Sequence, residues 1–289
     1  MPELKTPDAR VLGSFRTSDG VEIVYGVDDF TPRWKPAETV LLMHAAMGTM
    51  NRFRAWVPHF AGKYRVVRWD MRGHGASGKP SDDKALSLER LGQDCIELLD
   101  HLGLQKVHIG GSSTGGIIGM HLAVHRPERL LSLSSYAAIP GLAPSTTHNN
   151  YDDWESGLAK EGVRDFMKRT IEQRFRPGRH DPRLVDWFIE ESSRNEPRFL
   201  ARFVRMMTHG DFGDRLGEIR CPTLFVVPSN DPVHSMENYE ALKAVPGHRF
   251  VVFEDMAHNI TDAVPDRCAA EMAKFLDQIE GAQPARSRG

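Results

Sequence analysis

Short apolar runs recur along the chain and alternate with segments of helical spacing. Seven of these runs are rich in aliphatic and β-branched residues and end at turn signals, which predicts strands: VEIVYGV, TVLLMH, YRVVRWD, KVHIGG, LLSLSSYA, TLFVVPS and RFVVFED. Several runs are apolar almost without alternation, as expected for strands whose two faces are both covered by helices. The pattern therefore predicts an α/β fold with one mainly parallel, doubly wound sheet.

The clearest predicted helix is SLERLGQDCIELLDHLG, residues 87–103. Ser87 occupies the N-cap position, leucines and Cys95 form one apolar stripe, and Gly103 ends the segment. Two more helices are predicted at IIGMHLAVH and CAAEMAKFLDQI. The segments before residue 140 and after residue 220 are therefore expected to build one sheet domain.

The composition changes between about Pro140 and Ile219. This stretch has helical spacing, dense charge of both signs and no strand-like run. We expect a helical insertion that covers the carboxyl edge of the sheet, where open α/β sheets bind ligands. The predicted organisation is a core domain of residues 1–139 and 220–280, a helical cap of residues 140–219 and a disordered tail of residues 281–289.

The charge balance and the cysteines argue against several classes of protein. The 289 residues carry a formal net charge of −2, without the basic excess typical of nucleic-acid or membrane-surface binding. The N-terminus lacks an apolar leader, and no run approaches the roughly 18 apolar residues of a membrane span. Cys95, Cys221 and Cys268 are far apart and form no paired motif, so neither disulfides nor a zinc site are expected. We expect a cytoplasmic protein, and the sequence leaves homodimer formation open.

Two adjacent serines lie between two pairs of glycines in GGSSTGGIIGM, residues 110–120. A predicted strand precedes them and a predicted helix follows, which is the context in which the G-x-S-x-G pattern is meaningful. Only GSSTG at residues 111–115 satisfies this pattern. A sharp strand-to-helix turn strains its central residue, and the flanking glycines leave room for it. Ser113 is therefore the candidate nucleophile. The alternatives are a plain tight turn and a glycine-rich phosphate loop, and the phosphate loop is disfavoured because no phosphate-loop motif is in phase.

A serine nucleophile needs a base that accepts its proton and an acid that orients the base. Asp231 follows the predicted strand TLFVVPS, and His258 lies in the loop after RFVVFED, which gives the chain order Ser, Asp, His. Asp70 also follows a strand, but it precedes Ser113. His234 shares a loop with Asp231, which favours a pocket or surface position. We predict Asp231 as the orienting acid and His258 as the base.

An oxyanion that forms on an attacked carbonyl needs two backbone N–H donors. Thr114 follows the candidate nucleophile and supplies the first. The stretch LLMHAAMGTM follows an early strand, and its position predicts Ala46 as the second donor.

Other histidines receive structural interpretations. His121 and His125 form an H-x-x-x-H pair on a predicted helix, but no glutamate stands between them. A solvated or capping role is therefore favoured over metal binding. His44, His74 and His108 adjoin strand ends, where a structural role is also favoured. No metal site is predicted.

Five motifs in this order resemble those of the α/β-hydrolase superfamily: HAAMGTM, RVVRWDMRGHGAS, GGSSTGG, NDP and MAHN. Within it, the chain is most similar to β-ketoadipate (3-oxoadipate) enol-lactone hydrolases, over RVVRWDMRGHGASGKP, LERLGQDCIELLDHLGLQKVHIGGSSTGG and DDWESGLAKEGVRDFMKRTIEQRF. The resemblance implies the α/β-hydrolase fold, with an eight-stranded sheet and a helical cap. It also implies Ser113 as nucleophile, Asp231 as orienting acid and His258 as base. Trp154 matches a pocket tryptophan.

The chain departs from the family pattern in two places. It has His44-Ala45 where many members have His-Gly, and Ser112 precedes the nucleophile in place of a larger residue. Neither departure removes a group that the mechanism needs, so both concern the substrate.

These features predict a cofactor-free serine hydrolase that cleaves a small carboxylic ester or lactone through an acyl-enzyme. Two alternatives stay open: the same triad acting on an amide or carbon–carbon bond, and a non-catalytic ligand sensor on the same fold. Four cap arginines are candidate partners of a substrate carboxylate, although solvated helix faces are the expected position of most: Arg164, Arg169, Arg202 and Arg205.

Overall fold

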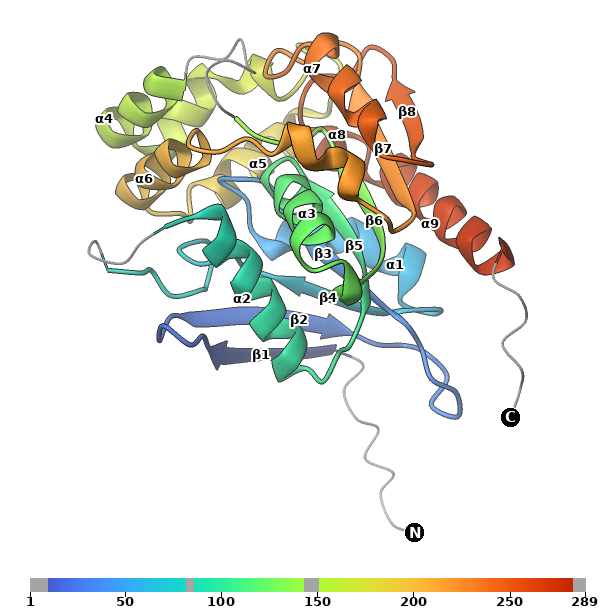
Figure 1. Cartoon of the computed structure of the whole chain (residues 1–289). Helices are drawn as coiled ribbons and strands as arrows, with labels where there is room; N and C mark the ends of the chain where they lie inside the picture. The colour runs from blue at the N-terminus through green and yellow to red at the C-terminus, as the bar shows by residue number, and fades with distance from the viewer. Residues whose placement is uncertain (1–9, 82–85, 143–150, 283–289) are drawn as a thin grey trace.

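The computed structural model describes residues 10–81, 86–142 and 151–282, which contain one eight-stranded sheet (Figure 1). Its strands are β1 (Arg10–Arg16), β2 (Glu22–Asp28), β3 (Thr39–Met43), β4 (Arg65–Trp69), β5 (Val107–Ser112), β6 (Leu130–Tyr136), β7 (Thr223–Pro228) and β8 (Arg249–Phe253). The strand order is β1-β2-β4-β3-β5-β6-β7-β8. The pairs β1/β2 and β2/β4 are antiparallel and all other neighbours are parallel. The predicted mainly parallel sheet is confirmed.

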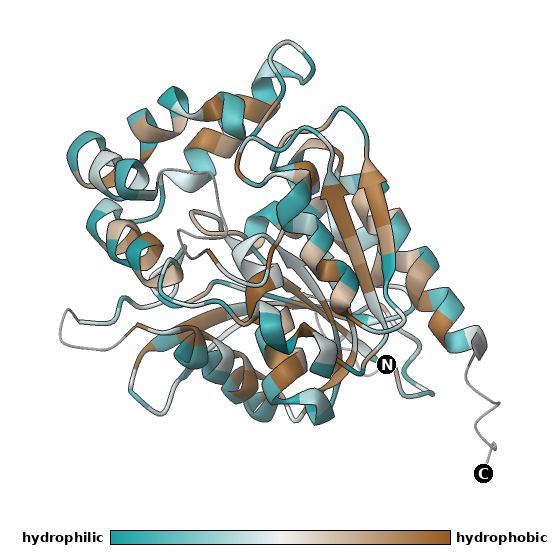
Figure 2. Cartoon of the chain, turned by 45° about the horizontal axis from the view of Figure 1, so that its top comes forward, coloured by the Kyte–Doolittle hydropathy of each residue, from teal (hydrophilic) through white to brown (hydrophobic). Residues whose placement is uncertain are grey.

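Helices cover both faces of this sheet. The α-helices are α1 (Val57–Phe60), α2 (Leu88–His101), α3 (Thr114–His125), α4 (Tyr151–Arg169), α5 (Pro182–Ser192), α6 (Pro197–Met207), α7 (Met236–Glu240), α8 (Ile260–Ala263) and α9 (Pro265–Ala282). The 3-10 helices are η1 (Met50–Trp56), η2 (Pro127–Arg129), η3 (Ile171–Gln173), η4 (Gly213–Glu218) and η5 (Ala241–Ala244). Figure 2 shows brown, apolar strands inside and teal, polar segments on the helices around them.

Alternate strand residues enter two separate hydrophobic clusters. Leu41 and Met43 of β3 pack with residues of α2 and α3. Val40 and Leu42 pack with residues of η1, α1 and α9 on the opposite face. Because side chains alternate between the faces of a strand, burial on both faces explains why the apolar runs lack polar alternation.

The first strand, β1, was not among the seven predicted runs. It lies at the sheet edge, and its Val11 and Leu12 are 51% and 61% exposed, so it lacks the apolar continuity of the central strands. The turn that joins it to β2 contains Asp19-Gly20, and Gly20 has φ 85°. An Asp-Gly pair between two short strands is a hairpin signal, and it identifies this strand pair where hydrophobicity does not.

Helix α2 begins and ends as predicted. The Ser87 hydroxyl accepts a hydrogen bond from the Arg90 N–H at 3.1 Å and so caps the first turn. Gly103, just past the end, has φ 67°, a left-handed conformation that glycine adopts without a steric penalty. The buried face of the helix contains the predicted leucines together with Cys95.

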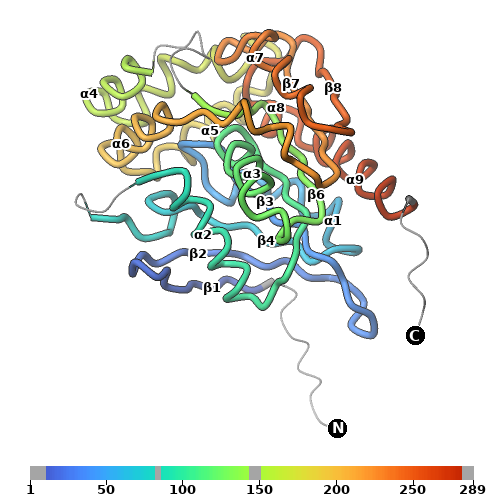
Figure 3. The backbone as a smooth tube through the Cα atoms, in the orientation of Figure 1, coloured from blue at the N-terminus to red at the C-terminus, as the bar shows by residue number. Residues whose placement is uncertain are grey.

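The chain leaves the sheet after β6, runs through α4, α5 and α6, and returns to β7 (Figure 3). We call residues 151–219 the cap segment. Its described elements are helical, as predicted, and Gly162 kinks α4 with φ 79°. Helix α9 continues to Ala282, and residues 283–289 of the predicted tail lie outside the described residues. Within the described ranges, no helix is long and apolar enough to cross a membrane.

Candidate active site

Ser113 lies at the turn between β5 and α3. Its backbone has φ 48° and ψ −113°, a conformation that residues other than glycine rarely adopt. Its N–H donates to the Tyr136 carbonyl of β6 at 2.8 Å, and its carbonyl accepts from the Ile117 N–H at 2.9 Å. The sheet and the first turn of α3 therefore hold the strained residue in place.

The glycines on either side of this turn allow backbone segments to touch. A Cβ atom on Gly111 would lie 2.4 Å from the Gly115 carbonyl oxygen. A Cβ atom on Gly115 would lie 2.2 Å from the Met43 carbonyl oxygen of β3. Both distances are far shorter than van der Waals contact, so the sharp turn requires glycine at these two positions.

The second serine of the pair has a different environment. Ser112 Oγ is buried and lies 2.8 Å from Thr261 Oγ1, on helix α8. This contact joins β5 to the C-terminal part of the chain. The two adjacent serines therefore differ in position, and only Ser113 lies beside an imidazole.

The structure brings the three predicted triad residues together. His258 Nε2 lies 3.1 Å from Ser113 Oγ, and His258 Nδ1 lies 2.8 Å from Asp231 Oδ2. Because an ionised carboxylate only accepts hydrogen bonds, we assign the proton to Nδ1, which leaves Nε2 free to accept the Ser113 hydroxyl hydrogen. Asp231 follows β7 and His258 follows β8, so the carboxyl ends of parallel strands bring both residues to the elbow.

Three donors surround the Asp231 carboxylate. In addition to His258, the Tyr239 hydroxyl donates to Oδ2, and the Val233 N–H donates to Oδ1 at 2.8 Å. Burial alone would raise the pKa of Asp231, but the charge and hydrogen bond of His258, with the Tyr239 hydroxyl, lower it below its usual value. The carboxylate therefore stays ionised and can stabilise a positive charge on His258.

Two unused backbone donors lie beside Ser113. Ala46 and Thr114 line the same cavity as Ser113, and their N–H groups have no hydrogen-bond partner in the described part of the chain. Thr114 is the first residue of α3, where helix geometry leaves the N–H free. Near Ala46, the Gly48 N–H donates to the Ala45 carbonyl at 3.0 Å in a tight turn, and Met47 has φ 60°. This arrangement can bind an oxyanion.

Asp70, the competing acid, has a structural environment. Its Oδ1 accepts from the Met50 N–H at 2.7 Å and its Oδ2 accepts from the Ala76 N–H at 2.8 Å. Both bonds tie the loop after β4 to neighbouring backbone, and burial raises the pKa of this carboxyl. Asp70 does not contact His258.

His234 is buried beside the base. It is 2% exposed, and its ring lies edge-on to the His258 ring at 5.2 Å between centroids. Burial excludes the surface position that the sequence allowed for His234, because the loop after β7 folds inward against Tyr239. Burial lowers the pKa of His234 to about 3, which keeps the imidazole neutral.

The other histidines have protein partners. His44 Nε2 accepts from the Met71 N–H, His74 Nδ1 donates to the Arg72 carbonyl, and His108 lies between Ser132 and Glu38. The His121 and His125 ring centroids lie 4.1 Å apart with the rings tilted by 31°, and His125 Nε2 lies 2.7 Å from the Arg215 guanidinium. Over residues 10–81, 86–142 and 151–282, no group of three or more His, Cys, Asp or Glu side chains is arranged to hold a metal ion.

Ser113 lines a small cavity between the core and the cap segment. Its volume is about 40 Å³, room for about three water molecules. The core contributes Ala45, Ala46, Met47, Arg52, Ser113, Thr114, Leu142, Val233, His258 and Asn259, and the cap segment contributes Tyr151, Trp154, Met167, Arg174, Phe188, Phe203, Val204 and Met207. Trp154, predicted from the resemblance, is therefore a cavity residue.

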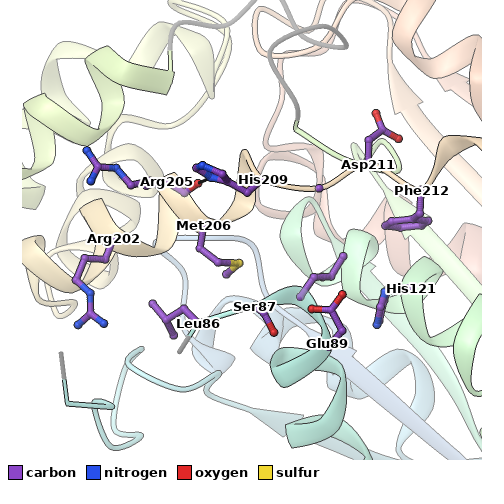
Figure 4. A pocket seen from close by; sticks show the side chains of 12 residues that line it. Leu86, Ser87, Glu89, His121, Arg202, Arg205, Met206, His209, Asp211 and Phe212 are labelled. Carbon is purple, nitrogen blue, oxygen red and sulfur yellow. Dashed lines mark hydrogen bonds between the residues drawn. The ribbon is translucent and has the colours of Figure 1, made fainter. Parts of the chain in front are cut away.

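The four cap arginines singled out in the sequence do not line this cavity. Arg164 pairs with Glu190, Arg169 with Asp153 and Glu161, and Arg205 with Glu155, and these three arginines are exposed. Arg202 and Arg205 line a separate, open pocket of about 630 Å³ between α6 and α2 (Figure 4). That pocket contains neither Ser113 nor His258.

Two other arginines, Arg52 and Arg174, line the cavity and were missed in the sequence. Arg52 follows the predicted Ala46 loop, and Arg174 lies just after α4 and η3. Charged residues are dense around Arg174 and sparse around Arg52, and in neither place does the local sequence separate a buried arginine from an exposed one.

Comparisons with known proteins agree with this geometry. The family model described as "alpha/beta hydrolase fold" matches residues 38–262. A 3-oxoadipate enol-lactonase of Acinetobacter baylyi is 27% identical over 210 residues, 70% of this chain and 75% of its own length. A putative carbamate hydrolase of Azorhizobium caulinodans is 26% identical over 258 residues, 84% of this chain and 93% of its own length.

Solved structures share the fold. A hydrolase of Pseudomonas aeruginosa superposes with a TM-score of 0.82 at 27% identity, over 92% of this chain and 98% of that chain. An enol-lactonase of Burkholderia xenovorans superposes with a TM-score of 0.83 at 19% identity, over 92% of this chain and all of that chain. The chain therefore belongs to the alpha/beta hydrolase family and is a hydrolase of that fold.

Proposed function

We propose that the protein is a cofactor-free serine hydrolase that cleaves a small carboxylic ester or lactone through an acyl-enzyme. The observation that supports this most directly is the continuous relay from Ser113 Oγ through His258 to Asp231, with distances of 3.1 and 2.8 Å. Hydrogen-bond contact between nucleophile, base and orienting acid is the geometric requirement for this chemistry.

In the first half-reaction, Ser113 Oγ attacks the substrate carbonyl carbon and passes its proton to His258 Nε2. The N–H groups of Ala46 and Thr114 bind the oxyanion, and Asp231 stabilises the imidazolium. The bond between the carbonyl carbon and the leaving oxygen then breaks, and His258 returns the proton to that oxygen. An acyl-Ser113 ester and an alcohol result; for a lactone, the alcohol stays attached to the acyl group.

In the second half-reaction, water takes the place of the alcohol. His258 accepts a proton from the water as its oxygen attacks the acyl carbon, and the same two N–H groups bind the new oxyanion. The bond to Ser113 Oγ then breaks, and His258 protonates the released serine. The product is a carboxylic acid, and the enzyme returns to its starting state without any cofactor.

The small cavity and the relatives support a small ester or lactone. A cavity volume of about 40 Å³ holds few atoms, so a substrate larger than this needs some movement of the cap side chains. The relative from Acinetobacter baylyi carries the name of an enol-lactonase, and a structural neighbour from Thermogutta terrifontis that of an esterase. Trp154 contributes its ring to the substrate-binding wall.

The proposal is tested by measuring turnover of short-chain esters, lactones, amides and vinylogous diketones side by side. We expect esters or lactones to be cleaved fastest, and Ser113→Ala to lower kcat on the best of them by at least about 10⁴-fold. Ser112→Ala is the matched control, because it removes the adjacent hydroxyl outside the relay; kcat should stay within about tenfold of the original.

Three results would contradict the proposal. Unchanged turnover in Ser113→Ala would show that Ser113 is not the nucleophile. Exclusive cleavage of amides or diketones would support the alternative bond type. Saturable ligand binding without turnover of any of the four classes would support a sensor.

A further inference from the structure

Arg174 is a buried cation in the wall of the candidate catalytic cavity. The residue is 4% exposed and lines the cavity together with Ser113 and His258. Its Nη1 donates to the Thr170 carbonyl at 2.8 Å and to the Thr170 hydroxyl at 2.9 Å. Its Nη2 reaches only a sulfur, Met47 Sδ at 4.0 Å, and its Nε has no hydrogen-bond partner in the described ranges.

No acidic side chain balances this charge. Among the described residues, no carboxylate forms an ion pair with Arg174, and the described cavity wall contains neither Asp nor Glu. Arg52, the second cavity arginine, lies 3.7 Å from Asp262. A buried charge without a partner is costly, and the cation–π contact of Arg174 with the Trp154 ring at 4.9 Å does not replace a counter-ion.

Two further donors in the same wall are also unsatisfied. Arg52 Nε and Trp154 Nε1 are buried and have no hydrogen-bond partner within the described part of the chain. Both residues line the cavity with Arg174. Buried donors are almost always paired in proteins, so three with unused capacity around one cavity indicate that an acceptor-rich group enters it.

We propose that Arg174, with Trp154 and Arg52, forms a subsite for a carboxylate carried by the substrate. The planar guanidinium presents parallel N–H donors that match the two oxygens of a carboxylate. This inference rests on the proposed hydrolase function and narrows its substrate class to esters or lactones that carry an anionic group.

The backbone around Arg174 places the subsite beside the reacting groups. The Arg174 carbonyl accepts a hydrogen bond from the N–H of Asn259, the residue after His258, at 3.2 Å. The side chain of Arg174 meets Met47, the residue after Ala46. Arg174 therefore contacts the loop of His258 through its backbone and the loop of Ala46 through its side chain, and it lines the same cavity as Ser113.

The guanidinium stays charged at neutral pH. Burial, with repulsion from Arg52, lowers the pKa of Arg174 to about 9. A bound carboxylate opposes both effects, so binding is expected to raise this pKa again. The subsite is therefore cationic before and after an anion enters.

Wild-type enzyme provides the first test, with two pairs of esters of similar size. Monomethyl succinate against methyl butyrate places the charge on the acyl side, and acetoxyacetate against propyl acetate places it on the alcohol side. We expect at least one anionic ester to exceed its neutral partner in kcat/KM by about 10- to 100-fold. The pair that responds shows which side of the ester the subsite binds.

Variants of Arg174 provide the second test. Arg174→Met should reduce the ratio of kcat/KM for the anionic over the neutral ester to about one, and Arg174→Lys should restore part of it because the charge remains without the fork. Arg164→Gln is the matched control: this cap arginine is exposed and pairs with Glu190, so the ratio should stay at the wild-type value.

An anionic-to-neutral ratio near one for both pairs in the wild type overturns the inference, even while ester turnover supports the hydrolase function. A ratio that survives in folded Arg174→Met overturns it too. If that variant does not fold, the wild-type ratios and competitive inhibition decide: butyrate should inhibit at least tenfold more tightly than butyramide, and equal inhibition contradicts the subsite. No turnover of any ester would instead count against the hydrolase function.

Discussion

The core and the cap segment each contain a buried charged side chain, and the two side chains differ in their partners. In the core, the Asp231 carboxylate accepts from three donors, and its charge faces the imidazole that needs it. In the cap segment, the Arg174 guanidinium is also buried, but it has two bonds to Thr170 and no acidic partner among the described residues. The hydrogen-bonded triad lies within the core, whereas the cap segment contains a buried cation that no described acid balances.

From this difference we expect the core to carry out the reaction and the cap segment to select the substrate. The groups that we propose to move protons and bind the oxyanion follow the carboxyl ends of β3, β5, β7 and β8. Much of the apolar wall and the unbalanced cation come from α4, α5, α6 and the segment after η3. Changes in the core should therefore alter every substrate alike, and changes in the cap segment should alter the choice among substrates.

The largest expected effect is that of Asp231→Asn. The amide loses the negative charge and no longer fixes the His258 tautomer, so kcat should fall by about 10⁴-fold for anionic and neutral esters alike. Steady-state kinetics with one ester of each kind measure it. A decrease in kcat confined to anionic esters would show that Asp231 recognises the substrate, and it would contradict the division of roles between core and cap segment.

Lowering the pH should destabilise the junction between the two regions. The buried His74 ring packs against Phe199 and Phe203 of α6, and burial lowers the pKa of His74 to about 4 from 6.5. The folded state disfavours protonation of His74, so the full free energy of unfolding is present above pH 6.5. As the pH falls toward 4, the free energy of unfolding should decrease by about 3 kcal/mol. Urea unfolding of the wild type and of His74→Gln at several pH values measures this. The difference in free energy of unfolding should shrink toward pH 4; a constant difference would contradict it.

A cap residue, Glu191, contacts the segment after β3 in which Ala46 lies. Glu191 of α5 accepts from the Thr49 hydroxyl at 2.7 Å and from the Asn51 amide at 3.1 Å, and it is 4% exposed. Glu191→Ala leaves two donors without their acceptor and should lower the free energy of unfolding by about 1–3 kcal/mol. The neighbouring Glu190→Ala is the control, since that side chain is exposed. Equal changes in the free energy of unfolding for Glu191→Ala and Glu190→Ala would show that the hydrogen bonds of Glu191 do not stabilise the fold.

The smallest expected effect is that of Tyr239→Phe. It removes one of three donors to Asp231 and should lower kcat about fivefold, because the other two remain. Since that hydroxyl helps to lower the pKa of Asp231, its loss should move the acid limb of the kcat profile to higher pH. A pH profile that matches the wild type would show that the hydroxyl does not tune the carboxylate.

Sequence patterns predicted the core better than the cap segment. Gly111 and Gly115 indicate a close approach of backbone segments, and the predicted strand ends indicate where Asp231 and His258 lie. Both signals are local in the sequence, so they can be recognised without the structure. The eight-stranded sheet followed from the family resemblance, although exposed β1 escaped the hydrophobic pattern.

The contacts that depend on tertiary packing could not be read from the chain. Arg174 and Arg164 look alike in sequence, yet Arg174 is buried with no acidic partner in the described ranges, and Arg164 is exposed beside Glu190. The inward fold of His234 was missed for the same reason. The roles of Ala46 and Thr114, the cytoplasmic location and the homodimer stay predictions.

The most direct measurement for the central claim is labelling with a fluorophosphonate, followed by peptide mapping by mass spectrometry. Attack by the activated hydroxyl displaces fluoride and leaves a phosphonyl group on the serine. The account predicts one adduct per chain, on Ser113, slower labelling in Asp231→Asn and none in Ser113→Ala. An adduct on another serine, or an unlabelled wild-type enzyme that still cleaves esters, would contradict it.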